Sequence, residues 1–92
     1  MNNIPNKYKN FINENIKFLL ELYNTNYKDS DESTYGIIYI KEKDNNIDVS
    51  YLTYVNIINY KIIDEDTVNN LKKMKNKLVF IKDTDKSYLF LL

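Results

Sequence analysis

Lysine and carboxylate clusters are the side chains of this sequence whose type and spacing could support chemistry. One short segment is crowded with lysines: Lys72, Lys73, Lys75 and Lys77. Such a patch could contact a phosphate backbone, and tyrosines stacked on unpaired bases would add to the binding. The same lysines would also stabilise the carboxyl end of a helix through its dipole. The patch therefore gives a nucleic-acid hypothesis and a purely structural alternative.

An acidic segment carries partial calcium-loop spacing. Asp29, Asp31 and Ser33 occupy the first, third and fifth positions of such a loop. The match then fails, because Thr34 stands where the loop needs glycine and Ile40 where it needs the bidentate glutamate. We therefore interpret the segment as a solvated polar loop and predict no metal site.

Catalytic groups are scarce. The chain has no His and no Cys, and all 13 basic residues are Lys. The usual nucleophile–histidine pairs are therefore absent, as are the nitrogen and sulfur ligands of zinc and haem sites. Gly36 is the only glycine, so a glycine-rich phosphate loop cannot form. Asp64 and Asp66 are explained by capping of a helix. We predict a protein that is not an enzyme and holds no cofactor.

Length and composition indicate one domain spanning residues 1–92. The net charge is zero, which disfavours nucleic acid and acidic membranes as partners. The amino terminus lacks the apolar stretch of a signal peptide, and no segment is long enough to cross a membrane, so we expect a cytoplasmic protein. Asn, Lys, Ile and Tyr are abundant, which is typical of an AT-rich genome.

Periodicity predicts a small α+β domain. Its expected order is α-β-β-(β)-α-β-β, a mainly antiparallel sheet packed with one long N-terminal helix and one short helix. Whether residues 57–63 extend the second strand or form a separate third strand stays open, and we prefer the separate strand. The expected elements are a helix over 5–23, strands over 34–42, 47–55, 57–63, 78–82 and 87–92, hairpin turns at 43–46 and 83–86, and a helix that begins near Asp64.

Alternation makes both faces of this sheet apolar. In the first strand Tyr35 and Tyr39 point to one side while Ile38 and Ile40 point to the other. A sheet with one wet face should alternate apolar and polar residues. Either the helices cover opposite faces, or another chain buries one face; a homodimer would also satisfy the pattern. In the second case we expect the partner to contact Tyr35, Tyr39, Leu52 and Tyr54.

We therefore interpret the chain as a protein-binding module whose partner is another protein of unknown identity. Its size and coding bias suggest a stoichiometric inhibitor from a phage or mobile element, of the anti-CRISPR or anti-defence type, or an immunity protein. The alternative is a small nucleic-acid-binding regulator that uses the lysine patch at 72–77 and tyrosine stacking.

Overall fold

The computed structural model describes residues 3–27, 35–74 and 76–92. The loop residues Asp29, Asp31 and Ser33, and also Lys75, lie outside the described residues. The elements in chain order are α1 (Asn6–Glu14), α2 (Ile16–Asn26), β1 (Gly36–Lys43), β2 (Asn46–Thr53), α3 (Tyr54–Asn59), α4 (Glu65–Met74), β3 (Leu78–Lys82) and β4 (Ser87–Leu91).

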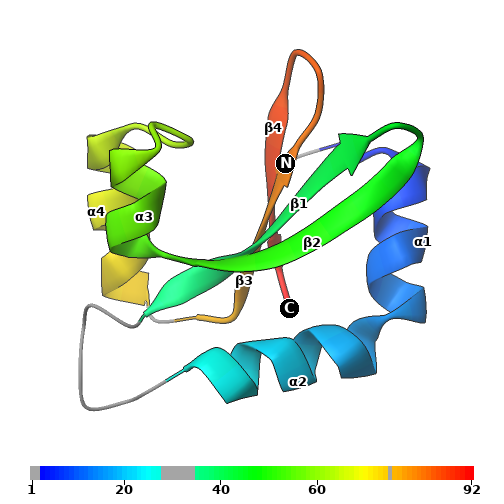
Figure 1. The fold of residues 1–92 in the computed structure, drawn as a ribbon, viewed down its shortest axis with the longest axis horizontal. Helices are drawn as coiled ribbons and strands as arrows, with labels where there is room; N and C mark the ends of the chain where they lie inside the picture. The colour runs from blue at the N-terminus through cyan, green and yellow to red at the C-terminus, as the bar shows by residue number, and fades with distance from the viewer. Residues whose placement is uncertain (1–2, 28–34, 75) are drawn as a thin grey trace.

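The sheet has four strands in the order β2-β1-β3-β4. The β1–β2 and β3–β4 pairs are antiparallel hairpins, whereas the central β1–β3 pair is parallel. The parallel pair arises because α3 and α4 connect β2 to β3 and return the chain to the far side of β1 (Figure 1). The α+β class is thus confirmed, and the sheet is mixed, with its antiparallel pairs at the two sides.

The long N-terminal helix is two helices. Asn15 separates them with φ −119° and ψ 21°, and its side-chain amide donates to the Phe11 carbonyl oxygen over 2.8 Å. An asparagine side chain that bonds a carbonyl of the preceding turn competes with the helical backbone. The chain turns there, so that α1 and α2 run in different directions (Figure 1). Helix α2 also continues past Tyr23, where the expected helix ends, to Asn26.

The separate strand expected over 57–63 is wrong, because α3 occupies Tyr54–Asn59 and a turn follows it. Thr53 caps this helix by accepting the Asn56 N–H over 3.2 Å. The β-branched residues of the segment suggested a strand. Their spacing allows Tyr54 and Ile57 to face the core together, and that packing prevails over the strand preference.

Two local predictions are confirmed. The β1–β2 hairpin turns on Asp44 and Asn45, whose φ values are 52° and 65°, as a tight turn between right-twisted strands requires. Helix α4 begins after Asp64, whose carboxylate accepts the Thr67 N–H over 2.9 Å. The Thr67 hydroxyl also donates to this carboxylate over 2.7 Å. The hydrogen bond from the hydroxyl, and next the one from the N–H, lowers the pKa of Asp64 below its ordinary value of 3.8. Lys72 and Lys73 lie in the last turn of α4, where they complement its dipole.

The helices cover opposite faces of the sheet, which is the first of the two arrangements expected for a sheet with two apolar faces. Helices α1 and α2 pack on the face that carries Ile38 and Ile40, together with Tyr8 and Leu19. Helices α3 and α4 pack on the other face, where Ile37, Tyr54, Ile57, Val68, Leu71, Leu78 and Phe80 form a second core. The β-strands therefore form the middle layer of three.

Among the described residues, no helix is both long and apolar enough to cross a membrane.

Candidate protein-binding face

All four tyrosine and leucine positions predicted to bind a partner lie on the α3/α4 side of the sheet, with Tyr54 at the start of α3 itself. Tyr35, Tyr39 and Leu52 are half-buried against the second core, and Tyr54 belongs to it. The structure thus brings the four residues to one face, but it gives them different exposures. Only some of them can offer surface to another molecule.

Tyr54 and Tyr35 are held within the fold. Tyr54 is 3% exposed, and its hydroxyl lies 3.5 Å from the Leu71 carbonyl oxygen. Burial, and to a smaller extent the nearby Tyr23 hydroxyl, raises the pKa of Tyr54 to about 12. Tyr35 is half-buried and its hydroxyl accepts from the Tyr27 hydroxyl over 2.9 Å. Tyr54 therefore offers no contact surface in this conformation, and Tyr35 offers little.

Tyr39 lies where α3 and α4 cease to shield this face of β1 from solvent. Along β1 on this face, Ile37 is fully buried, Tyr39 is half-buried and Lys41 is exposed. The Tyr39 ring stacks on Phe80 with centroids 6.0 Å apart and an interplanar angle of 13°. Burial raises the pKa of the Tyr39 hydroxyl, which stays neutral and able to donate a hydrogen bond at ordinary pH.

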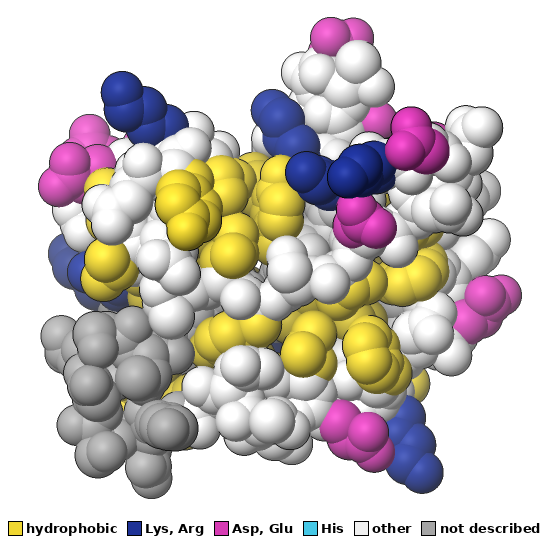
Figure 2. All heavy atoms as spheres, viewed as in Figure 1, with side chains coloured by type: hydrophobic (Ala, Val, Ile, Leu, Met, Phe, Trp, Pro, Cys, Tyr) yellow, Lys and Arg dark blue, Asp and Glu magenta, His cyan; other side chains and the backbone are white. Residues whose placement is uncertain are grey.

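The strand register extends this boundary across the sheet. Tyr39 pairs with Phe80 in the parallel ladder, and Phe80 pairs with Leu89 in the antiparallel one. Leu52 on β2 is half-buried on the same face, where it stands opposite Ile37, whereas Ser50 stands opposite Tyr39. We call the half-buried Tyr39, Leu52 and Leu89, with the buried Phe80 between Tyr39 and Leu89, the Tyr39 surface. Yellow side chains are visible above and below β2 in the space-filling view, so apolar groups reach the surface on both sides of this strand (Figure 2).

A groove adjoins the Tyr39 surface. It has a volume of about 360 Å³, and its lining combines apolar side chains with a few polar ones: Ile62, Ile63, Asp64, Thr67, Phe80, Ser87, Tyr88 and Leu89. Phe80 and Leu89 belong both to the groove and to the Tyr39 surface. The sequence reasoning missed Phe80 as part of the site, although the alternation of β3 placed it on the same face as Leu78. The missing information was the parallel pairing of β3 with β1.

Of the lysine patch, the structure describes Lys72, Lys73 and Lys77. Lys72 and Lys73 are exposed at the end of α4, and the Lys77 Nζ lies 5.8 Å from the centroid of the Tyr23 ring. Tyr23 is only 4% exposed, so its ring cannot also stack on a nucleic-acid base. Among the described lysines of the patch, the aromatic contact is therefore with a buried ring, which cannot serve the stacking that the nucleic-acid hypothesis needs.

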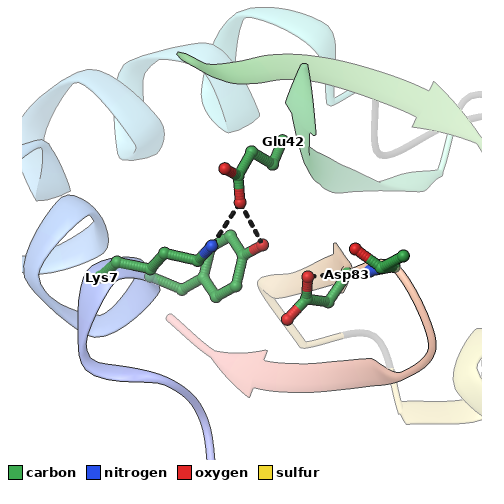
Figure 3. A network of polar contacts seen from close by, with 5 residues as sticks. Lys7, Glu42 and Asp83 are labelled. Carbon is green, nitrogen blue, oxygen red and sulfur yellow. Dashed lines mark hydrogen bonds and ion pairs between the residues drawn. The ribbon is translucent and has the colours of Figure 1, made fainter. Parts of the chain in front are cut away.

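A charged cluster that the sequence reasoning missed lies at the opposite end of the sheet. Lys7 and Glu42 form an ion pair, and the Tyr8 hydroxyl lies 3.4 Å from the same carboxylate (Figure 3). Asp83 lies nearby and accepts the Thr84 N–H over 2.8 Å. Burial, and next the charge of Asp83, raises the pKa of Tyr8. These residues come from α1, β1 and the β3–β4 turn, so no sequence spacing reveals them.

The charged cluster joins α1, β1 and the β3–β4 turn. The surrounding hollow of about 620 Å³ is lined by positive and negative groups in equal number: Lys7, Lys41, Glu42, Asp44, Asn45, Lys82, Asp83 and Thr84. Because these charges are equal in number, the hollow as a whole has no net charge to attract a ligand of either sign. Within the described residues, no three of His, Cys, Asp or Glu lie close enough to hold a metal ion.

Comparison with known proteins adds no relative: no family model, curated protein or solved structure matches the chain.

Proposed function

We propose that this chain is a non-enzymatic module that binds another protein through the Tyr39 surface. The observation that carries the proposal is the half-buried state of Tyr39 at the point where the cover of α3 and α4 ends. Tyrosine offers a large contact area at a low cost in side-chain entropy, and it keeps a hydroxyl for hydrogen bonding. A contact on this surface would complete the burial that the two short helices leave unfinished.

The charges beside the Tyr39 surface define the chemistry of the partner. Lys41 and Lys82 are paired in the parallel ladder, one position beyond Tyr39 and Phe80, and both are exposed. Alternation places them on the α3/α4 face with Tyr39. We expect the partner to present an aromatic-binding hollow flanked by carboxylates, because complementary charge fixes register and speeds association.

Two observations favour a protein over a single-stranded nucleic acid. One face of the Tyr39 ring is already occupied by Phe80, so a base could stack only on the other. Asp48 stands directly opposite Lys41 in the β1–β2 ladder, so the charges of Lys41, Lys82 and Asp48 sum to only +1, which suits a single ion pair with a carboxylate better than a phosphate backbone. Nucleic-acid binding by Lys72 and Lys73 is the alternative function, and the experiment below distinguishes it from protein binding.

A module of this kind acts by occupying the surface of its partner, in the manner of a stoichiometric inhibitor or an immunity protein. Such activity needs affinity and no catalytic group, in agreement with a chain that has no His and no Cys. The central aromatic residue would then contribute a disproportionate share of the binding energy.

The test is capture of partners from lysate of the source cells on tagged wild-type protein, with and without nuclease. Tyr39→Ala removes the proposed anchor, and Tyr60→Ala is the matched control, because Tyr60 is 66% exposed and lies outside the Tyr39 surface. We expect one protein near equal stoichiometry on wild type and Tyr60→Ala, its loss on Tyr39→Ala, and no effect of nuclease.

A second variant separates lost binding from lost folding. Lys41→Glu combined with Lys82→Glu changes only exposed side chains, and we expect weaker capture of the same protein without loss of helical circular dichroism. If the captured material is lost on nuclease treatment, or in a variant that carries only Lys72→Glu and Lys73→Glu, the nucleic-acid alternative would be supported instead. Equal capture by wild type and Tyr39→Ala would overturn the proposed surface.

A further inference from the structure

β2 is an edge strand of the sheet, and the direction of its backbone groups follows from one hydrogen bond. The Tyr54 N–H donates to the Tyr35 carbonyl oxygen over 3.0 Å, one pair beyond the Gly36–Thr53 end of the ladder. Hydrogen-bonded pairs alternate along an antiparallel ladder. Even-numbered residues of β2 therefore bond to β1, and odd-numbered ones, with Val49 at the centre, direct their N–H and C=O groups outward.

This edge lacks the features that usually keep sheet edges apart. β2 pairs with β1 over eight residues without a bulge, and it contains neither proline nor lysine. Asp48 is its one charged residue. Within the part of the chain that the structure describes, Ile47 and Val49 make no hydrogen bond outside the sheet. Figure 1 shows β2 as the outer strand, with no helix drawn across it in this view.

The sequence of β2 is complementary to itself. In an antiparallel pairing centred on Val49, the two Val49 residues stand opposite each other and Ile47 faces Tyr51 of the second copy. These side chains lie on the α1/α2 face, where each is already half-buried. Apolar and aromatic cross-strand pairs stabilise such a ladder. On the other face Asp48 lies opposite Ser50, so the two Asp48 carboxylates do not face each other.

We propose that β2 pairs with β2 of a second copy about Val49, and so joins two four-stranded sheets into one. The zero net charge of the chain removes long-range repulsion between copies at neutral pH. The surface differs from the Tyr39 surface, and it goes beyond the proposed function. Success or failure of partner capture therefore leaves this inference unaffected.

Amide hydrogen exchange on the native chain tests the pairing without a substitution. In a monomer, the Asp48 and Ser50 amides are protected by β1, while the outward Ile47 and Val49 amides exchange quickly. We expect light scattering to show a dimer that dissociates on dilution, and protection of Ile47 and Val49 that rises with the dimer. A strictly monomeric chain at sub-millimolar concentration would overturn the proposal, as would a dimer whose Val49 amide exchanges quickly.

Proline substitution gives an independent test. Val49→Pro removes an outward N–H, which an edge strand tolerates, whereas the matched Ser50→Pro removes an N–H that bonds β1. We expect Val49→Pro to be folded and monomeric and Ser50→Pro to be unfolded. A folded Val49→Pro that still dimerises contradicts the proposal. If Val49→Pro fails to fold, the exchange pattern of the native chain decides.

Discussion

The Tyr27 hydroxyl donates a hydrogen bond to the Tyr35 hydroxyl over 2.9 Å and joins the end of α2 to the start of β1. The two rings meet edge to face, with centroids 4.9 Å apart. Tyr23 stacks on Tyr27 at 5.6 Å and meets Tyr51 edge-on at 5.9 Å. Four tyrosines thus connect a helix to both strands of the first hairpin.

Removal of the Tyr27 hydroxyl should destabilise the fold. We expect Tyr27→Phe to lower the free energy of unfolding by about 1 kcal/mol, because the part-buried hydrogen bond is lost while the ring is retained. Urea denaturation of Tyr27→Phe, Tyr35→Phe and the double variant gives the coupling between the hydroxyls. Tyr60→Phe, at an exposed ring, is the control. Strict additivity of the two single variants would contradict the described bond.

Gly36 is required by the close approach of β2. A Cβ atom at this position would lie 2.0 Å from the Leu52 carbonyl oxygen, and the backbone of a paired strand cannot withdraw without breaking the ladder. We expect Gly36→Ala to cost more than about 2 kcal/mol, as strained overpacking does. Thermal unfolding measures the loss. The control Ser50→Ala, on an exposed β2 position, should change the stability little; a Gly36→Ala variant as stable as this control would contradict the packing.

Lys61 holds a backbone conformation that suits glycine. Its φ is 55°, and its N–H donates to the Ile58 carbonyl oxygen as α3 ends. A left-handed non-glycine residue costs about 1 kcal/mol. We expect Lys61→Gly to raise the stability by up to that amount. Lys73→Gly, within α4, should instead lower it by about 1 kcal/mol. Urea denaturation measures the free energy of unfolding of both variants. If both variants were stabilised, or both destabilised, the result would contradict the left-handed backbone conformation of Lys61.

Because Tyr51 and Tyr54 have raised pKa values, we expect the fold to lose stability at alkaline pH. Burial, and next the nearby Tyr23, raises the pKa of Tyr51 and of Tyr54 from 10.0 to about 12. The unfolded chain releases these protons near pH 10, whereas the folded chain retains them. Stability contributed by the neutral rings is therefore complete below pH 10 and is lost as the pH rises toward 12.

Urea midpoints measured across this pH range test the linkage. Tyr54→Phe should weaken the dependence, since phenylalanine does not titrate, and Tyr60→Phe should leave it intact. An unfolding midpoint that stays constant from neutral pH to 12 would contradict the burial of Tyr54.

Local patterns in the sequence predicted much of the fold. Features that depend on neighbouring residues could be predicted from the sequence. They include the hairpin turn at Asp44 and Asn45, the helix cap at Asp64 and the strand Leu78–Lys82. The two apolar faces also followed from alternation along single strands. The break at Asn15 was not predicted, because the hydrogen bond of its side chain prevails over the apolar spacing that favours one long helix. The segment after Thr53 was predicted as a strand, but packing in the core prevails there over the strand preference of its residues.

The candidate site was less accessible to sequence reasoning. The sequence analysis grouped Tyr39 and Tyr54 as partner contacts, but Tyr54 lies in α3 and not in the expected strand 47–55. Only the packing of α3 and α4 shows that Tyr54 is buried and Tyr39 is half-buried. Phe80 joins Tyr39 through a parallel pairing between strands far apart in the chain. Contacts of this range depend on topology, which spacing within a segment does not contain.

The affinity of the captured partner for wild type, Tyr39→Ala and Tyr60→Ala, compared by titration calorimetry, tests the central claim most directly. If Tyr39 is the anchor of the binding surface, its truncation should weaken binding at least about tenfold, as for a central aromatic residue of an interface. Tyr60→Ala should bind like wild type. Equal affinity of Tyr39→Ala and wild type, with both proteins folded, would contradict the claim that this chain binds its partner through the Tyr39 surface.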